Sequence, residues 1–207
     1  MRRRPAPPPV GDRIQRAAAA LALVVLSPLI AALAAAVALS MGRPVLFRSP
    51  RAGLHGEPFE LLKFRTMRAP TYPDEPDAER LTRFGAFLRS TSLDELPELV
   101  NIVRGEMVLV GPRPLFDYYT EHYGPLESRR LDVKPGLTGW AQVNGRNALA
   151  WPERFELDAW YVENRSWMLD LRILARTATT VLGRKGVSHE GDVTMPVWVH
   201  RSDGSDR

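Results

Sequence analysis

The stretch AAAALALVVLSPLIAALAAAVALSM, residues 17–41, decides the architecture of this chain because it carries no charged residue. A helix of this length is long enough to cross a hydrocarbon core of about 30 Å. A cleaved signal peptide is the first alternative, since Arg2, Arg3 and Arg4 precede the stretch. However, the apolar run exceeds the roughly 7 to 15 residues usual for a signal peptide. The sequence therefore predicts an N-terminal membrane helix over residues 13–41.

Arginines lie on both sides of this apolar segment. Arg13 and Arg16 precede it, while Arg43, Arg48 and Arg51 follow it closely. Positive residues favour the cytoplasmic side of a membrane, so a spanning segment normally has them at one end. Arginines at both ends instead favour a segment that enters and leaves the membrane by the same face.

The middle of the segment contains Ser27 and Pro28. Pro28 has no N–H and its ring crowds the carbonyl of Val24, while the Ser27 hydroxyl can bond to a freed backbone group. This pair predicts a re-entrant helix broken at Ser27-Pro28. A spanning helix with an incidental proline is the alternative, and on local physics the two are about equal.

Composition limits the remaining choices. A length of 207 residues fits one compact domain with an appendage. The absence of cysteine excludes disulfides, thiolate metal sites and cysteine nucleophiles. The net charge of +4 suits anionic lipid, a phosphate-bearing substrate and nucleic acid equally. No Walker loop, GxSxG elbow or zinc motif occurs, which removes P-loop kinases, serine hydrolases and zinc hydrolases from the simplest options.

The rest of the chain predicts a mixed, helix-rich α/β fold. Two short strands joined by a glycine turn are expected between Pro44 and Met67, and another strand in MVLVGPRPL, residues 107–115. The first helix expected after the hairpin, over residues 79–89, is amphipathic. This pattern suits either a helix that lies on a membrane surface or one that packs on the protein core. Apolar spacing predicts helices over residues 79–89, 92–103, 151–163 and 167–182.

Asp94 and Glu95 follow Ser92 at the expected start of the 92–103 helix. Ser92-x-x-Glu95 is spelled as a capping box, so these acids can simply begin a helix. A helix N-terminus also favours an ionised carboxylate, which suits attack on phosphorus or the binding of a divalent cation. Capping and catalysis are compatible, and the dipeptide alone does not choose between them.

Basic residues from separate segments complement these acids. Arginine's planar fork suits a diphosphate, and Mg²⁺ prefers carboxylate and substrate phosphate oxygens to a cage made of protein alone. Taken singly, each cation is better explained as a surface or ion-pair residue. If these cations converge in the fold, they indicate phosphate chemistry at a membrane. The candidate cations are Lys63, Arg65, Arg89 and Arg113.

Five motifs in order carry a resemblance to a known family. They are GRPVLF (42–47) followed by Arg51 and Gly53, KFRTM (63–67), FLRSTSLDELPELVNIVRGEM (87–107), VGPRP (110–114) and KPGLTGWAQVNGRN (134–147). Together they resemble the bacterial sugar transferases, specifically the small monotopic phosphoglycosyl transferases. The resemblance implies a re-entrant membrane helix, interfacial amphipathic helices and a small cytoplasmic catalytic region over residues 42–182. A disordered basic N-terminus (1–12) and a polar C-terminal tail (183–207) would flank them.

The same resemblance implies an enzyme that transfers a sugar 1-phosphate from a UDP-sugar to polyprenyl (undecaprenyl) phosphate and releases UMP, initiating glycan or exopolysaccharide assembly. Asp94 would be the nucleophile that carries a covalent phosphosugar, and it would hold Mg²⁺. Glu95 would be its partner in the dyad. The residues that would bind the substrates are Lys63, Arg65, Arg89, Arg113, Arg146 and Asp158.

The implied location is the bacterial cytoplasmic membrane, with the catalytic region facing the cytoplasm and membrane lipid as a partner. The chain departs from the family at Ser49, where glutamine is frequent, in the loop over residues 69–77 and in the tail after Gly183. A silent scaffold is a rival hypothesis, which the intact Asp94-Glu95 pair argues against. Nucleic-acid binding lacks a basic-aromatic motif and leaves the apolar segment unexplained. The donor sugar, the glycan pathway and a homodimer stay open.

Overall fold

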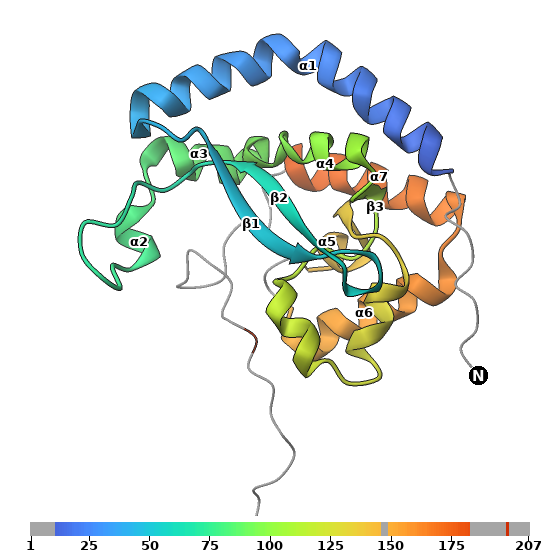
Figure 1. The fold of residues 1–207 in the computed structure, drawn as a ribbon. Coiled ribbons are helices and arrows are strands. Elements are labelled where there is room, and N and C mark those ends of the chain that lie inside the picture. The colour runs from blue at the N-terminus through green and yellow to red at the C-terminus, as the bar shows by residue number, and fades with distance from the viewer. Residues whose placement is uncertain (1–10, 146–148, 183–197, 199–207) are drawn as a thin grey trace, which may run out of the picture.

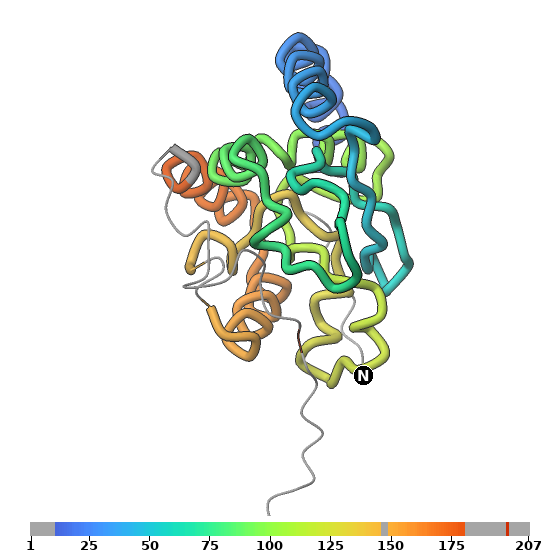
Figure 2. Tube along the Cα trace, turned by 90° about the vertical axis from the view of Figure 1, so that its left-hand side faces the viewer, coloured from blue at the N-terminus to red at the C-terminus, as the bar shows by residue number. Residues whose placement is uncertain are grey.

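The computed structural model describes residues 11–145, 149–182 and 198. The chain forms a helix-rich α/β body with the long helix α1, Asp12–Met41, along one side (Figure 1). Figure 2 shows α1 standing at the edge of the body. The expected mixed, helix-rich α/β class is confirmed. The expected disordered N-terminus and polar tail lie almost wholly outside the described residues.

Helix α1 is continuous through Ser27 and Pro28, and Figure 1 shows it arched over the body. The Ser27 hydroxyl donates a hydrogen bond to the carbonyl of Val24 at 2.7 Å. In a regular helix this carbonyl would accept a hydrogen bond from the N–H of residue 28. Pro28 has no N–H, and its ring crowds the same carbonyl. The break expected at this pair therefore takes the form of curvature within one helix.

The middle of α1 presents large apolar side chains to its surroundings. Val24 is 70% exposed and Val25 67% exposed. On its inner side, Leu33 and Val37 pack in a buried cluster with Leu88. Within the described part of the chain, α1 is the one helix long and apolar enough to cross a membrane. At 30 residues it would extend about 45 Å if it were straight.

Both ends of α1 are attached to the same body. Near its start, the side chain of Gln15 accepts a hydrogen bond from the backbone N–H of Leu109 at 2.9 Å. At its end, the guanidinium of Arg65 donates to the carbonyl of Met41 and to that of Gly42, the latter at 2.7 Å. The two bonds from Arg65 satisfy carbonyls that a helix leaves unpaired at its C-terminus.

The expected hairpin is confirmed. Strands β1 (Leu46–Ala52) and β2 (Pro58–Phe64) pair antiparallel, and a single 3₁₀ turn, η1 (Leu54–Gly56), joins them. Gly53 at the turn has to be glycine because an added Cβ would lie 2.8 Å from the carbonyl oxygen of Glu57. The hairpin delivers Lys63, near the end of β2, to the site described below.

A second, smaller sheet joins two of the sequence motifs. Strand β3 (Val108–Val110) was expected, and it pairs parallel with β4 (Gly136–Thr138), which was not. The two motifs approach so closely that a Cβ on Gly136 would lie 2.1 Å from the backbone nitrogen of Gly111. Glycine in both motifs therefore permits this contact between backbones.

The remaining helices follow the sequence pattern in part. The expected 79–89 helix is divided into α2 and α3, and the expected 92–103 helix into η2 and α4, whereas the last two helices match the prediction. Their bounds are α2 (Asp77–Arg80), α3 (Arg83–Thr91), η2 (Leu93–Glu95), α4 (Glu98–Arg104), η3 (Asp117–His122), η4 (Glu127–Asp132), α5 (Trp140–Val143), α6 (Trp151–Asn164) and α7 (Trp167–Leu182).

Candidate active site

Asp94 and Glu95 lie in a tight turn between two helices. Helix α3 ends at Thr91, the next residue, Ser92, adopts left-handed geometry with φ of 56°, and η2 follows at once. Non-glycine residues with positive φ are uncommon and concentrate at functional sites. The Ser92 side chain makes no capping hydrogen bond to η2, and α4 begins only after Pro97. The capping-box interpretation is therefore wrong, because the Ser92 side chain does not cap η2, and both acids lie in η2, ahead of α4.

Glu95 is held by two cations. Its Oε1 atom lies 2.7 Å from Nζ of Lys63 and 2.9 Å from Nη2 of Arg113. Burial opposes ionisation of the carboxyl, but Lys63 and Arg113 outweigh burial and hold the pKa of Glu95 well below its usual range. Glu95 is therefore ionised and fixed in place by residues from β2 and from the loop after β3.

A third carboxylate, Glu98, which was not among the residues predicted for the site, joins this group. Its Oε1 atom lies 3.1 Å from Nζ of Lys63, and its side chain is 2% exposed. Burial raises the pKa of Glu98 to about 7, against the opposing effect of Lys63. Lys63 thus bridges two carboxylates on neighbouring turns. The i, i+3 spacing of Glu95 and Glu98 was the available signal.

Asp94 differs from its neighbour in having no direct partner. Within the described residues its carboxylate forms no hydrogen bond or ion pair, although the residue is only 8% exposed. Burial and Glu95 raise its pKa, while Lys63, Arg113 and Arg89 act in the opposite direction. The Asp94 carboxylate therefore has no direct partner, and the charges of Glu95 and of three cations all act on it. A carboxylate without a direct partner can attack phosphorus, and nearby cations can offset the charge of an anionic substrate.

The predicted cations do not all converge. Lys63 and Arg113 contact Glu95, and Arg89 acts on Asp94 while its Nε atom donates to Oγ1 of Thr66 at 3.0 Å. Arg65 instead makes its hydrogen bonds to the end of α1. Arg146 lies outside the described residues.

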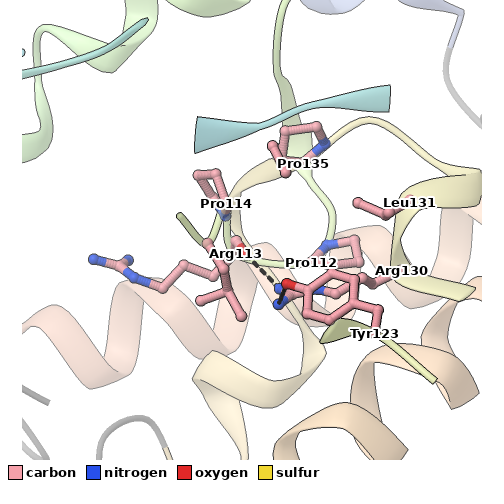
Figure 3. A pocket seen from close by; sticks show the side chains of 9 residues that line it. Pro112, Arg113, Pro114, Tyr123, Arg130, Leu131 and Pro135 are labelled. Carbon is pink, nitrogen blue, oxygen red and sulfur yellow. Dashed lines mark hydrogen bonds between the residues drawn. The ribbon is translucent and has the colours of Figure 1, made fainter. Parts of the chain in front are cut away.

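Asp158 lies on α6 behind the loop that carries Arg113. It is 1% exposed and pairs with Arg130 at 3.0 Å. Arg130 in turn donates to the backbone carbonyl of Arg113 and to the hydroxyl of Tyr123 (Figure 3). The structure therefore places Asp158 where it supports the Arg113 loop, and not where it faces the carboxylates.

The small pocket in Figure 3 lies beside this loop, and the side chain of Arg113 points away from it. Neither Asp94 nor Glu95 lines the pocket. The pocket therefore marks the back of the loop. Its lining residues are Ala52, Pro112, Arg113, Pro114, Leu115, Tyr123, Arg130, Leu131 and Pro135.

The carboxylates of the site were expected to hold a Mg²⁺ ion. The described residues contain no group of three or more metal-ligating side chains. Glu95 is occupied by two cations, so Asp94 is the carboxylate left to contact a metal. Mg²⁺ commonly takes one or two carboxylates and completes its shell with water and substrate phosphate. The residues fit a metal that arrives with a phosphate substrate, and the metal stays a prediction.

The cluster of carboxylates and cations around η2 thus occurs in a chain whose helix α1 is long and apolar enough to cross a membrane. The model of the family described as bacterial sugar transferase matches residues 11–184, and the chain belongs to this family. The predicted family is confirmed.

Individual relatives support the same assignment. The chain is 48% identical over 179 residues to a sugar transferase of Bacillus subtilis named EpsL, covering 83% of this chain and 86% of that protein. It is 38% identical over 202 residues to the exopolysaccharide production protein ExoY of Rhizobium meliloti, covering 86% and 89%. It is 42% identical over 184 residues to the UDP-glucose:undecaprenyl-phosphate glucose-1-phosphate transferase of Xanthomonas campestris, covering 81% of this chain and 37% of that longer protein.

Proposed function

We propose that this chain transfers a sugar 1-phosphate from a UDP-sugar to polyprenyl phosphate, giving a polyprenyl-diphosphate-sugar and UMP. The observation that carries the proposal is the unpaired carboxylate of Asp94 among cations, next to a Glu95 that two of those cations hold. The names of relatives from Xanthomonas campestris, Caulobacter vibrioides and Escherichia coli specify UDP-glucose and undecaprenyl phosphate for those proteins.

The first step would be attack by a carboxylate oxygen of Asp94 on the β-phosphorus of the donor. A new oxygen–phosphorus bond forms, the bond from that phosphorus to the bridging oxygen breaks, and UMP leaves with the electron pair. Lys63, Arg89 and Arg113 would stabilise the negative charge that builds up on the phosphate oxygens. The product of this step is a phosphosugar linked to Asp94.

The second step would be attack by a phosphate oxygen of the polyprenyl phosphate on the same phosphorus. The bond to Asp94 breaks and the carboxylate is restored. A carboxylate with so low a pKa is a weak base, so Glu95 would not act by removing a proton. It would instead serve both steps by holding Lys63 and Arg113 in place. Mg²⁺, where bound, would supply charge that reduces the repulsion between Asp94 and the donor diphosphate.

The attachments of α1 support a monotopic arrangement at the cytoplasmic membrane. A helix that spanned a bilayer would place its ends on opposite sides, yet Gln15 and Arg65 connect the two ends of α1 to one polar body. The exposed apolar middle of the arch would enter the lipid, and both ends would stay on the cytoplasmic side. Phe87 on α3 is 44% exposed and would lie at the interface.

The test is release of UMP by the purified protein in detergent with Mg²⁺, undecaprenyl phosphate and a panel of UDP-sugars. Acceptor-dependent release with one donor is expected, and Asp94→Asn should abolish it because the nucleophilic charge is lost with little change in volume. Asp74→Asn is the matched control, since Asp74 is an exposed loop residue whose φ of 59° asparagine tolerates. Full activity of Asp94→Asn would show that the nucleophile is another residue.

A further inference from the structure

Arg51 is a further cation of this site, and it has no role in the chemistry proposed above. It is the penultimate residue of β1, and the N–H of its neighbour Ala52 donates to the carbonyl of Leu115 at 2.9 Å. That bond ties the end of β1 to the loop that carries Arg113. Arg51 and Arg113 therefore come from segments that are far apart in the chain but adjacent in the structure.

The guanidinium of Arg51 is held in position but has no acidic partner. Its Cζ atom lies 3.7 Å from the centre of the Phe116 ring, a cation–π contact. Within the described residues it forms no hydrogen bond or ion pair, and its Nε atom is buried without a hydrogen-bond partner. A buried donor left unpaired costs free energy, which an accepting ligand or water would recover.

The charges around Arg51 favour an anionic ligand. Burial and the like charge of Arg113 lower the pKa of Arg51 to about 10, so it stays charged at neutral pH. Glu98 acts on it from α4, but that carboxylate is paired with Lys63. The described group holds four cations against three carboxylates, namely Lys63, Arg51, Arg89 and Arg113 against Asp94, Glu95 and Glu98.

We infer that Arg51 is a phosphate-binding residue, whose guanidinium donates to an oxyanion that also contacts Arg113, with the Phe116 ring holding the fork in place. This inference rests on the proposed function, which supplies the phosphate. An anion between the two guanidinium groups would relieve their repulsion and satisfy the unpaired donor. The oxyanion belongs either to the donor diphosphate or to the acceptor phosphate.

Two measurements separate these sources. Binding of UDP is measured by calorimetry in the Asp94→Asn background, where the nucleophile is removed, and KM for undecaprenyl phosphate is measured in the otherwise unchanged enzyme. Arg51→Ala should weaken one of them roughly ten- to a hundredfold, the loss of a charge-assisted hydrogen bond. Weaker UDP binding assigns Arg51 to the donor, and a higher acceptor KM assigns it to the lipid phosphate.

Arg48→Ala is the matched control, because Arg48 lies on the same strand but is exposed and paired with Glu60. Should Arg51→Ala fail to fold, Arg51→Lys keeps the charge and removes the planar fork, and a similar loss is expected from it. UDP affinity and acceptor KM that both stay unchanged, with only thermal stability reduced, would overturn the inference in favour of a structural contact with Phe116. A parent protein that neither binds UDP nor releases UMP would instead overturn the proposed function, and this inference with it.

Discussion

The Nζ atom of Lys63 lies 2.7 Å from Oε1 of Glu95, whereas the preceding residue, Asp94, has no such contact within the described residues. Two adjacent acids thus have different environments. One is neutralised by ion pairs and the other remains available at the edge of the same cluster. Adjacent side chains in a tight turn point in different directions, which is how η2 separates them.

Replacing Glu95 should impair turnover without removing the protein from the membrane. Glu95→Gln removes the charge that orients Lys63 and Arg113, so kcat for UMP release should fall about a hundredfold, the scale of losing a preorganised electrostatic contact. Glu60→Gln, which alters an exposed ion pair of β2 with Arg48, should have little effect. Equal activities of the two variants would contradict the role given to Glu95.

The buried pair of Asp158 and Arg130 should matter for stability. Asp158→Asn leaves Arg130 charged and enclosed, which should lower the free energy of unfolding by roughly 3 to 5 kcal/mol. The control on the same helix is Glu163→Gln, because Glu163 pairs with Arg129 at the surface and such pairs contribute about 0 to 1 kcal/mol. Thermal unfolding in detergent compares the two variants, and similar losses would argue against the buried network.

Gly85 should tolerate no side chain. A Cβ there would lie 1.8 Å from the carbonyl oxygen of Thr66, which is backbone and cannot move aside without displacing the segment that follows β2. Gly85→Ala should therefore lower the melting temperature and reduce activity, since α3 leads directly to Ser92. Gly11→Ala is the control, because an added Cβ there meets nothing within 4 Å. Unchanged stability of Gly85→Ala would show that α3 can shift.

Glu98 should make stability depend on pH. Because burial raises its folded-state pKa from 4.5 to about 7, the protonated form is favoured in the folded protein. This contribution is full below pH 4.5 and is lost as pH rises through about 7, a change of up to about 3 kcal/mol. Glu98→Gln cannot titrate, so its melting temperature should fall less than that of the wild type between pH 5 and pH 8. Parallel pH profiles would contradict this assignment.

The orientation of α1 can be tested with single cysteines, because the chain has none. Gly11→Cys and Arg43→Cys flank the helix, and both should resist a membrane-impermeant thiol reagent in intact bacteria and react after permeabilisation. Asp74→Cys, in an exposed loop of the body, supplies the reference for the cytoplasmic side. Labelling of one flank in intact cells would defeat the re-entrant arrangement.

Local patterns of the sequence predicted much of the fold. The β1–β2 hairpin and helices α6 and α7 have regular apolar spacing and clear turn residues, and all match the prediction. Strand β4 was missed because three residues carry too little periodicity, and its partner β3 is distant in the chain. The expected 92–103 helix was placed too early because Ser92 resembles a cap in the sequence but adopts left-handed geometry in the structure.

The site was predicted less completely, because its geometry depends on ion pairs between residues that are far apart in the chain. Asp94, Glu95, Lys63 and Arg113 were identified from motifs and do converge. Arg130 sits in the run ESRRLD, which is typical of a solvated surface, and only its distant partner Asp158 reveals that it is buried. Charge pairing across the fold decides which ionisable residues support the site and which face a substrate.

A helix fastened to its domain at both ends moves with that domain as one body. The bonds of Gln15 and Arg65 therefore fix the distance between the arch of α1 and the turn that holds Asp94. If the arch rests in a bilayer, the Asp94 carboxylate keeps a constant height above the lipid surface. The meeting of enzyme and lipid acceptor then becomes a search in two dimensions, and its rate depends on the number of acceptor molecules per unit of membrane area.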